Sequence, residues 1–241
     1  MIKLFKILLL LLLIIGSIFL IYSKDYFIPK FNHIIFSLSS YTDNILKEVY
    51  VSGRRNETKN NIIQALNFDV GEPLFSLNLD QIRKNINNLS WVEKSNIYLL
   101  PLGKLEIEII EYIPFGRYAD ETGEYFLINN KGIKFKKIGI NEFQSIFKLH
   151  GLGALLNVNE LSFIINKLKT FNLEVLIAER IDSRRWNIYL KNRFFIKLPH
   201  LNATNSLEAL YKLDNNIDYD NLIFIDLRIK DRVSIKYKQV D

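Results

Sequence analysis

KEVYVSGRRNETKNNIIQALNFDVGEPLFSLNLDQIRKNINNLSWVEKSNIYLLPLGKLEIEIIEYIPFGRY, residues 47–118, contains the pattern that decides the fold. Val49 and Val51 alternate with polar neighbours before Gly53, which predicts a half-buried strand. Thr58 is a suitable N-cap for a helix that follows this strand. The apolar stripe of this helix consists of Ile62, Ala65 and Leu66.

A second helix and two strands complete the pattern. Asn78 followed by Gln81 has the spacing of a capping box, which predicts a helix start. The apolar residues of this helix recur at spacings typical of one buried face: Leu79, Ile82, Ile86 and Leu89. Residues 91–99 and 105–109 then read as strands joined by a turn at 101–103. The order strand, helix, helix, strand, strand predicts one small domain.

The rest of the chain predicts a second, larger sheet. Short alternating segments recur from Tyr125 to Tyr237, with turns at 129–132, 191–192 and 230–232. Two helical segments, 159–171 and 203–213, interrupt them. We therefore expect an α+β protein whose second domain is an antiparallel β-sheet with helices packed on one face. The predicted domain boundaries are 44–118 for the first domain and 119–241 for the β domain.

The N-terminal region reads as a membrane anchor. Residues 7–22 form an apolar run without charge, and with Leu4 and Phe5 they span roughly 28 Å as a helix. A cleaved signal peptide is the alternative, but no small-residue cleavage site follows the run. We expect a cytoplasmic tail at 1–6, a transmembrane helix at 7–23 and a juxtamembrane segment at 24–43. The apolar spacing in that last segment fits a helix lying on the membrane or one packed against the first domain.

Composition excludes several classes of protein. The 241-residue chain has a net charge of +6 without any dense basic cluster, so we expect no nucleic-acid partner. It contains no cysteine, which rules out disulfide scaffolds and thiolate metal sites.

No catalytic pattern is visible in the sequence. His33, His150 and His200 are separated from one another and from any metal-binding motif. Glu106 and Glu108 lie two apart on a predicted strand, where apolar neighbours mark them as the solvent face. Nucleophile elbows, phosphate loops and metalloprotease motifs are missing. We therefore expect no enzyme, no cofactor and no bound metal.

Several phrases of the chain resemble one known family. VSGRR and GEPLFSLNLDQIRKNINNLSWVEKSNIYLLPLGKLEIEIIEYIPFGRY are similar to the POTRA domain of the bacterial FtsQ/DivIB cell-division family, a βααββ module that binds polypeptide. RRWNIYLKN, IKLP and IDLRIKDRVSIKY are similar to the C-terminal half of the same family, in its alphaproteobacterial branch. The resemblance covers nearly the whole chain.

The last predicted strand is the candidate binding site. A strand at the end of a sheet exposes unpaired N–H and C=O groups, and another chain can pair with them. The resemblance implies that this strand and the turn before it receive a segment of FtsB, which arrives with FtsL. It also matches Arg228 and the pair Arg184 and Arg185 to arginines of the family, and arginine suits a partner carboxylate. The candidate partner-binding residues are Arg184, Arg185, Arg228, Ile229, Val233, Ser234, Ile235, Lys236 and Tyr237.

The resemblance also implies a cellular role. It predicts a single-pass inner-membrane protein with a cytoplasmic N-terminus and a periplasmic bulk, enriched at the division septum. Such a protein would act as a scaffold linking early and late division proteins, with FtsK-like or FtsW-like proteins contacting the POTRA domain. The alternative is a POTRA-bearing component of outer-membrane protein insertion or secretion, a class that usually carries several POTRA repeats and a barrel.

Overall fold

The computed structural model describes residues 44–213 and 221–239, which fall into two compact units. The chain divides between Glu111 and Tyr112. The predicted tail 1–6, transmembrane helix 7–23 and juxtamembrane segment 24–43 lie outside the described residues. Within the described ranges, no helix has both the length and the apolar character of a membrane span.

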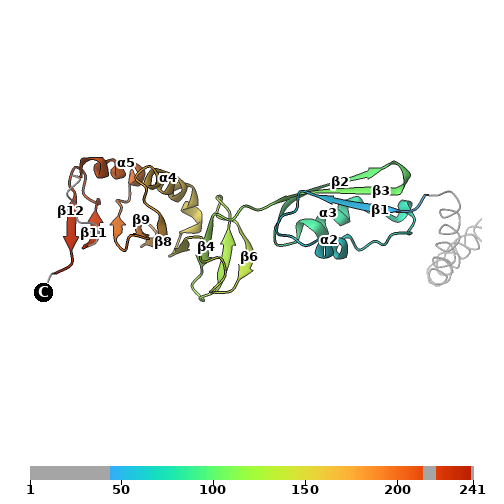
Figure 1. Ribbon diagram of the computed structural model, residues 1–241, viewed down its shortest axis with the longest axis horizontal. Coiled ribbons are helices and arrows are strands. Elements are labelled where there is room, and N and C mark those ends of the chain that lie inside the picture. Colours follow the sequence, from blue (N-terminus) through green and yellow to red (C-terminus); the bar gives the residue numbers. More distant parts are fainter. Residues whose placement is uncertain (1–43, 214–220, 240–241) are drawn as a thin grey trace, which may run out of the picture. The chain divides into compact units, whose positions relative to one another are not determined.

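The first unit is a three-stranded sheet with two helices on one face (Figure 1). The strand order is β1-β3-β2, in which β1 runs parallel and β2 antiparallel to the central β3. The predicted order strand, helix, helix, strand, strand is therefore confirmed. Its elements are β1 (Glu48–Ser52), α2 (Lys59–Leu66), α3 (Leu79–Asn87), β2 (Val92–Leu100) and β3 (Lys104–Glu111), with short 3-10 helices at Leu74–Ser76 and Pro101–Gly103.

Side-chain caps fix the starts of both helices. Thr58 Oγ1 accepts the N–H of Asn61 at 3.1 Å, and Asn78 Oδ1 accepts the N–H of Gln81 at 3.0 Å. The predicted capping box is only half formed, because the Gln81 side chain donates to Asn85 Oδ1 at 2.9 Å instead. Both helices bury their predicted apolar stripes against the sheet.

The second unit contains a nine-stranded sheet in the order β12-β11-β10-β9-β8-β7-β4-β5-β6. The predicted domain boundary after Tyr118 lies inside β4, which pairs with β5 and β7 of this sheet. The strands are β4 (Gly116–Ala119), β5 (Tyr125–Ile128), β6 (Lys134–Ile138), β7 (Lys148–His150), β8 (Val175–Ile181), β9 (Arg185–Leu190), β10 (Phe195–Lys197), β11 (Leu222–Asp226) and β12 (Ser234–Tyr237).

The prediction of an antiparallel sheet is wrong, because the sheet is mixed. The pairs β4–β7, β7–β8 and β10–β11 are parallel, and the other described pairs are antiparallel. Parallel neighbours need a crossover connection, and a helix usually supplies it. Helix α4 (Val158–Lys169) connects β7 to β8, and the helical segment after β10 precedes β11.

The helices pack on one face of this sheet, as predicted (Figure 1). The predicted helix 203–213 consists of a single α-helical turn, α5 (Ala203–Ser206), followed by a 3-10 helix at Leu207–Lys212. Trp186 and Phe194 are the largest fully buried side chains of the core beneath these helices. Half-buried Val233 and Ile235 pack against the same core, so it extends to the final strand.

Candidate functional site

Strand β12 is one end of the nine-stranded sheet and pairs only with β11 among the described residues (Figure 1). The two strands are antiparallel, with Ile235 opposite Ile225 and Ser234 opposite Asp226. A bulge between Leu222 and Phe224 adds one residue to β11 and leaves the alternation along β12 intact. The predicted hairpin at 230–232 therefore does produce an edge strand.

The backbone of β12 presents every second residue to its outer side. The N–H of Lys238 donates to the carbonyl of Asn221 at 2.8 Å, which turns the backbone groups of Lys238 towards the β11 side. Hydrogen-bonded positions alternate along an antiparallel strand, so Ser234 and Lys236 also face β11. The backbone groups of Ile235 and Tyr237 consequently face outwards, and those of Val233 continue the same row.

The side chains of β12 differ between the two faces of the sheet. Val233 and Ile235 contact the core beneath the helices, which holds the strand in register. Lys236 lies on the opposite face, is exposed and has no ion pair in the part of the chain described here. Tyr237 is 42% exposed and accessible to a partner.

A basic pocket of about 340 Å³ lies at the turn end of β12. It brings together strand ends and a turn, and its lining consists of Arg185, Asp226, Arg228, Ile229, Arg232 and Ser234. Of the nine predicted residues, the pocket therefore unites Arg185, Arg228, Ile229 and Ser234. Ile229 is 60% exposed at its rim, as expected for a turn residue.

Arg228 is already held by its own chain. Its Nε lies 2.9 and 3.0 Å from the two carboxylate oxygens of Asp226, and its Nη2 lies 2.6 Å from Oδ2. Burial raises the pKa of Asp226, but the hydrogen bonds from Arg228 outweigh it and leave the pKa lowered. The same hydrogen bonds raise the pKa of Arg228. Asp226 therefore orients the Arg228 guanidinium group, whose other N–H groups can donate to a carboxylate of a partner.

The other two arginines of the pocket differ in their pairing. Arg185 Nη2 lies 3.5 Å from a carboxylate oxygen of Asp182, a weak partly exposed pair. Arg232 forms no ion pair in the described ranges 44–213 and 221–239. It is the least compensated cation of the pocket, and the sequence analysis did not include it among the candidate residues.

Arg184 does not join this pocket. Arg184 precedes β9 in the turn that also contains Asp182. Its Nη2 lies 3.9 Å from Oδ2 of Asp182, and its side chain is 63% exposed. Its backbone carbonyl lies 2.8 Å from Nδ1 of His200. The structure thus separates the two arginines that the sequence presents as a pair.

An aromatic row crosses the open face of the sheet beside the edge strand. Tyr189 stacks on Phe195 with ring centroids 4.9 Å apart, and Phe195 contacts Phe224 at 5.5 Å. The register places Lys236 next in this row, opposite Phe224. Lys197 lies over the Phe224 ring at 3.8 Å from its centroid, a cation–π contact. Sequence reasoning missed this row, although each ring occupies a solvent-facing alternation position.

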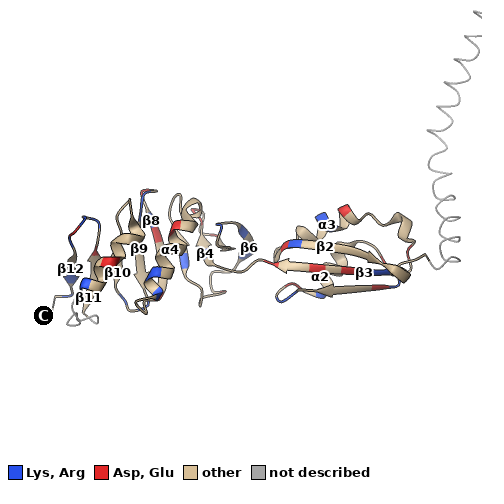
Figure 2. Cartoon of the chain, turned by 90° about the horizontal axis from the view of Figure 1, so that it is seen from above, with Lys and Arg blue, Asp and Glu red and all other residues tan. Residues whose placement is uncertain are grey.

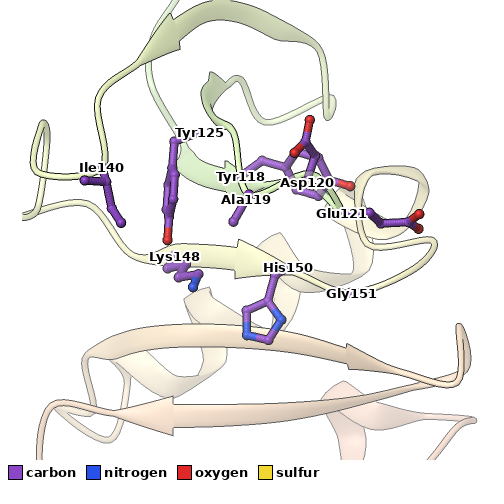
Figure 3. Close-up of a pocket in the computed structure, with 10 residues that line it drawn as sticks. Tyr118, Ala119, Asp120, Glu121, Tyr125, Ile140, Lys148, His150 and Gly151 are labelled. Atoms are coloured by element: carbon purple, nitrogen blue, oxygen red, sulfur yellow. The ribbon is translucent and has the colours of Figure 1, made fainter.

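A second pocket, of about 450 Å³, lies further along the sheet and collects titratable groups (Figure 3). Lys148 and His150 project from β7, and Asp120 comes from the turn after β4. Burial lowers the pKa of His150, although the charge of Glu179 opposes this. The Asp120 carboxylate accepts hydrogen bonds from its own turn, at Thr122 and Glu124, which orders that turn.

This arrangement contains no nucleophile that a base activates among the described residues. Figure 3 shows the His150 ring directed away from Asp120, so the two do not form an acid–base pair. No group of three or more metal-ligating His, Cys, Asp or Glu residues occurs in the described part of the chain. The outer side of β12 has main-chain groups that can pair with another polypeptide segment.

Comparison with known proteins gives matches over both units. Residues 45–112 match the model for the POTRA domain of FtsQ type, and residues 116–228 match the model for the C-terminal region of cell division protein FtsQ/DivIB. The chain is similar to cell division protein FtsQ of Rickettsia prowazekii, with 27% identity over 79% of this chain and 72% of that protein. FtsQ of Rickettsia bellii is 28% identical over the same shares. FtsQ of Agrobacterium fabrum is 26% identical over 79% of this chain and 61% of that protein.

Proposed function

The chain belongs to the FtsQ/DivIB family of bacterial cell-division proteins, and on that premise we propose that it is a scaffold which binds another division protein by strand addition at β12. The observation that carries the proposal is the outward row of main-chain groups at Val233, Ile235 and Tyr237. The matched family region ends at residue 228, before β12, so the proposal depends on the geometry of the edge itself.

Strand addition would fill the row of open backbone groups on β12. Each added main-chain hydrogen bond contributes about 1 kcal/mol net, and several in register give a specific complex. Because the side chains of β12 alternate between core face and open face, the partner segment also alternates. Its open-face residue opposite Lys236 would be acidic, since opposite charges directly across two strands attract and like charges repel.

The basic pocket would take an acidic side chain of the same partner. Arg228 is oriented by Asp226, Arg185 lies beside it, and Arg232 supplies the charge that is not compensated within the described chain. A carboxylate bound between planar guanidinium groups accepts charge-assisted hydrogen bonds, which are roughly twice as strong as neutral ones. The pocket therefore defines which end of the partner strand lies near the turn.

The cellular assignment follows the family. The partners of this edge would be FtsB-type and FtsL-type proteins, and FtsK-like or FtsW-like proteins would contact the POTRA domain. The apolar run near the N-terminus would anchor the chain in the inner membrane, with both described units in the periplasm at the septum. The role is binding and positioning, without a reaction catalysed by this chain.

A backbone substitution tests the proposal directly. Tyr237→Pro removes one outward N–H while leaving the hydrogen bonds to β11 in place, because proline is tolerated at an edge position whose N–H faces away from the sheet. We expect binding of the FtsB-type and FtsL-type partners from the same organism to weaken at least about tenfold, measured by co-purification and titration.

Two control variants separate the contributions. Tyr237→Ala removes the side chain and keeps the N–H, so it weakens binding less than Tyr237→Pro does. Tyr211→Ala alters another exposed tyrosine of the same unit and leaves binding unchanged. Equal binding by the Tyr237→Pro protein and the unaltered protein would show that β12 is not the binding edge.

A further inference from the structure

The first unit has its own open edge, at β1. In the order β1-β3-β2, the far side of β1 has no partner strand along Glu48–Ser52 in the described residues. The N–H of Lys47 donates to the carbonyl of Gly103 at 2.7 Å, so Lys47 faces the side of β3. By alternation, Val49 and Val51 face β3 as well, and the backbone groups of Glu48, Tyr50 and Ser52 face outwards.

The chain itself already occupies the beginning of this outer side. The N–H of Leu46 donates to the carbonyl of Glu72 at 2.9 Å, and the N–H of Gly71 donates to the carbonyl of Leu46 at 2.7 Å. Ile45 and Pro73 form an antiparallel bridge in the same position. Residues 71–73 therefore pair with residues 45–46, just before β1, and the outer side of Glu48–Ser52 has no partner strand in the described residues.

An apolar groove lies beneath the open part of the edge, towards the helices. It has a volume of about 680 Å³. Its apolar lining residues are Val49, Ile63, Leu66, Phe68 and Val70, and its other lining residues are Lys47, Glu48, Tyr50, Lys59 and Asp69. Ile63 on α2 and Val70 in the following loop are 42% and 63% exposed. Side chains of an added strand that point towards the helices would enter this groove and bury both residues.

The opposite face of the same edge is acidic. The register aligns Glu48 with Lys104, Tyr50 with Glu106, and Ser52 with Glu108. Lys104 pairs with Glu48 at 3.5 Å. Glu106 and Glu108 have no ion pair within residues 44–213 and 221–239, and Figure 2 shows acidic positions along β3. An added strand would lie beside β1, so long basic side chains on this face would extend across Tyr50 and Ser52 towards these carboxylates.

We propose that β1 is a second strand-accepting edge, which binds an extended polypeptide segment whose residues alternate between basic and apolar. The apolar residues would fill the groove beside Ile63. The basic residues would lie beside Glu48 of β1 and extend across this strand towards Glu106 and Glu108 of β3. The main-chain groups of Glu48 and Tyr50 would pair with the segment. This site is separate from β12 and binds a segment of opposite charge, so the proposal does not rest on the function assigned to β12.

A model peptide tests the proposal on the full chain. The probe is a synthetic peptide that alternates lysine and valine, compared with one that alternates glutamate and valine and with one that carries lysines and valines in two blocks. We expect only the lysine–valine alternating peptide to slow hydrogen exchange at the amides of Glu48 and Tyr50. Slower exchange in β2 instead, no protection at all, or equal protection by the glutamate peptide would overturn the proposal.

Substitutions identify the groups that bind. Tyr50→Pro removes an outward N–H and spares the bonds to β3, and Ile63→Asp places a charge in the groove without touching the strand. The double change Glu106→Lys and Glu108→Lys reverses the acidic face. Each variant is expected to weaken peptide binding roughly tenfold or more. If one variant fails to fold, the other two still test whether the peptide binds at β1.

Two control variants complete this test. Tyr98→Ala alters a 45% exposed tyrosine on β2, the other edge of this sheet, and leaves binding of the peptide unchanged. Tyr237→Pro disables the proposed β12 edge and also leaves it unchanged. A peptide that loses binding through Tyr237→Pro, and not through Ile63→Asp, binds at β12, and this result would refute the β1 site.

Discussion

Loss of the Glu160 carboxylate is expected to destabilise the second unit strongly. Arg180 Nη1 lies 2.7 Å from Glu160 Oε2, and the indole N–H of Trp186 donates to the same oxygen at 2.8 Å. The Arg180 side chain is only 5% exposed, and its Nε already has no hydrogen-bond partner. Arg180 and Trp186 flank the turn that carries Arg185 to the basic pocket, so the cluster also positions the site.

The magnitude follows from what remains after substitution. Glu160→Gln leaves the Arg180 charge buried without a counter-charge, and removal of one partner from a buried pair costs about 3–5 kcal/mol. Because the Glu160 side chain is 32% exposed and water reaches it, we expect the lower end, about 3 kcal/mol. Glu208→Gln is the matched control. Glu208 Oε1 lies 3.6 Å from Lys167 Nζ, and the Glu208 side chain is 67% exposed. Such an exposed ion pair contributes less than about 1 kcal/mol to the free energy of unfolding.

The assay is urea unfolding of the full chain in a Trp91→Phe background, where Trp186 is the sole fluorescent tryptophan. The free energy of unfolding of this unit should fall by about 3 kcal/mol in the Glu160→Gln protein. Adding Arg180→Met should restore part of it, because the uncompensated charge is then gone. A loss no larger than that of Glu208→Gln would refute the reasoning, and so would a further loss in the double variant.

Three other substitutions test separate features. Gly53→Ala should lower the free energy of unfolding of the first unit more than Gly71→Ala does, as measured in urea. Both glycines have positive φ, but of the two only Gly53 has a backbone oxygen of β3 at 2.1 Å from the position of an added Cβ. Equal losses of unfolding free energy in the two variants would contradict this reasoning. Burial raises the pKa of Glu111, yet backbone N–H groups outweigh it and the pKa is lowered, so its contribution to stability is present above about pH 4.3 and disappears as the pH falls through the lowered value. Glu111→Gln should therefore flatten the acid limb of the stability–pH curve for this unit, and an unchanged limb would exclude the effect. Arg232→Glu should weaken binding of the FtsB-type partner, and the loss of affinity should be larger at low salt than at high salt. Lys230→Glu, a neighbouring charge reversal, should cause a smaller loss. Equal losses in the two variants would indicate that the net charge of the turn, and not the pocket, determines the affinity.

The first unit could be predicted closely because its signals are local. Thr58 and Asn78 mark helix starts through hydrogen bonds to residues three positions away, and both bonds form. The stripe around Ile82 and Ile86 needs only helical spacing to be recognised. Even here the Gln81 side chain could either accept the backbone N–H of Asn78 or donate to Asn85 Oδ1, and sequence spacing alone does not decide between these two arrangements.

Strand direction in the second unit could not be predicted in the same way. A hairpin and a crossover both read as strand, connection, strand, and the alternation of side chains is the same in both. The helix between His150 and Val175 was the available signal, because a helical connection favours parallel neighbours. The prediction gave more weight to the neighbouring hairpins, such as the one between Leu190 and Phe195, which do join antiparallel strands.

The position of the final strand at one end of the sheet could be predicted, and its contacts could not. The final strand followed from alternation at Val233, Ile235 and Tyr237. The aromatic row could not be foreseen, since Tyr189, Phe195 and Phe224 come from separate strands whose order was unknown. These contacts depend on register between strands, which no single segment determines.

Arg228 has a contact within its own chain that the sequence did not predict. The sequence suggested a free arginine for a partner carboxylate, and the structure pairs it with Asp226 through several hydrogen bonds. A partner that binds there would share the guanidinium group rather than neutralise it. The free charge comes from Arg232, so a substitution at Arg228 affects the shape of the pocket as much as its charge.

The two proposed edges use one kind of backbone recognition and opposite electrostatics. Main-chain pairing alone would let any extended segment add to either edge, because every polypeptide offers the same N–H and C=O groups. Lys236 and Arg232 would repel a basic segment at β12, whereas Glu106 and Glu108 of the neighbouring β3 would repel an acidic segment at β1. Specificity depends on the difference between right and wrong partners, and repulsion of the wrong one widens that difference without strengthening the right one. Each edge can therefore stay open to its own partner and resist the partner of the other.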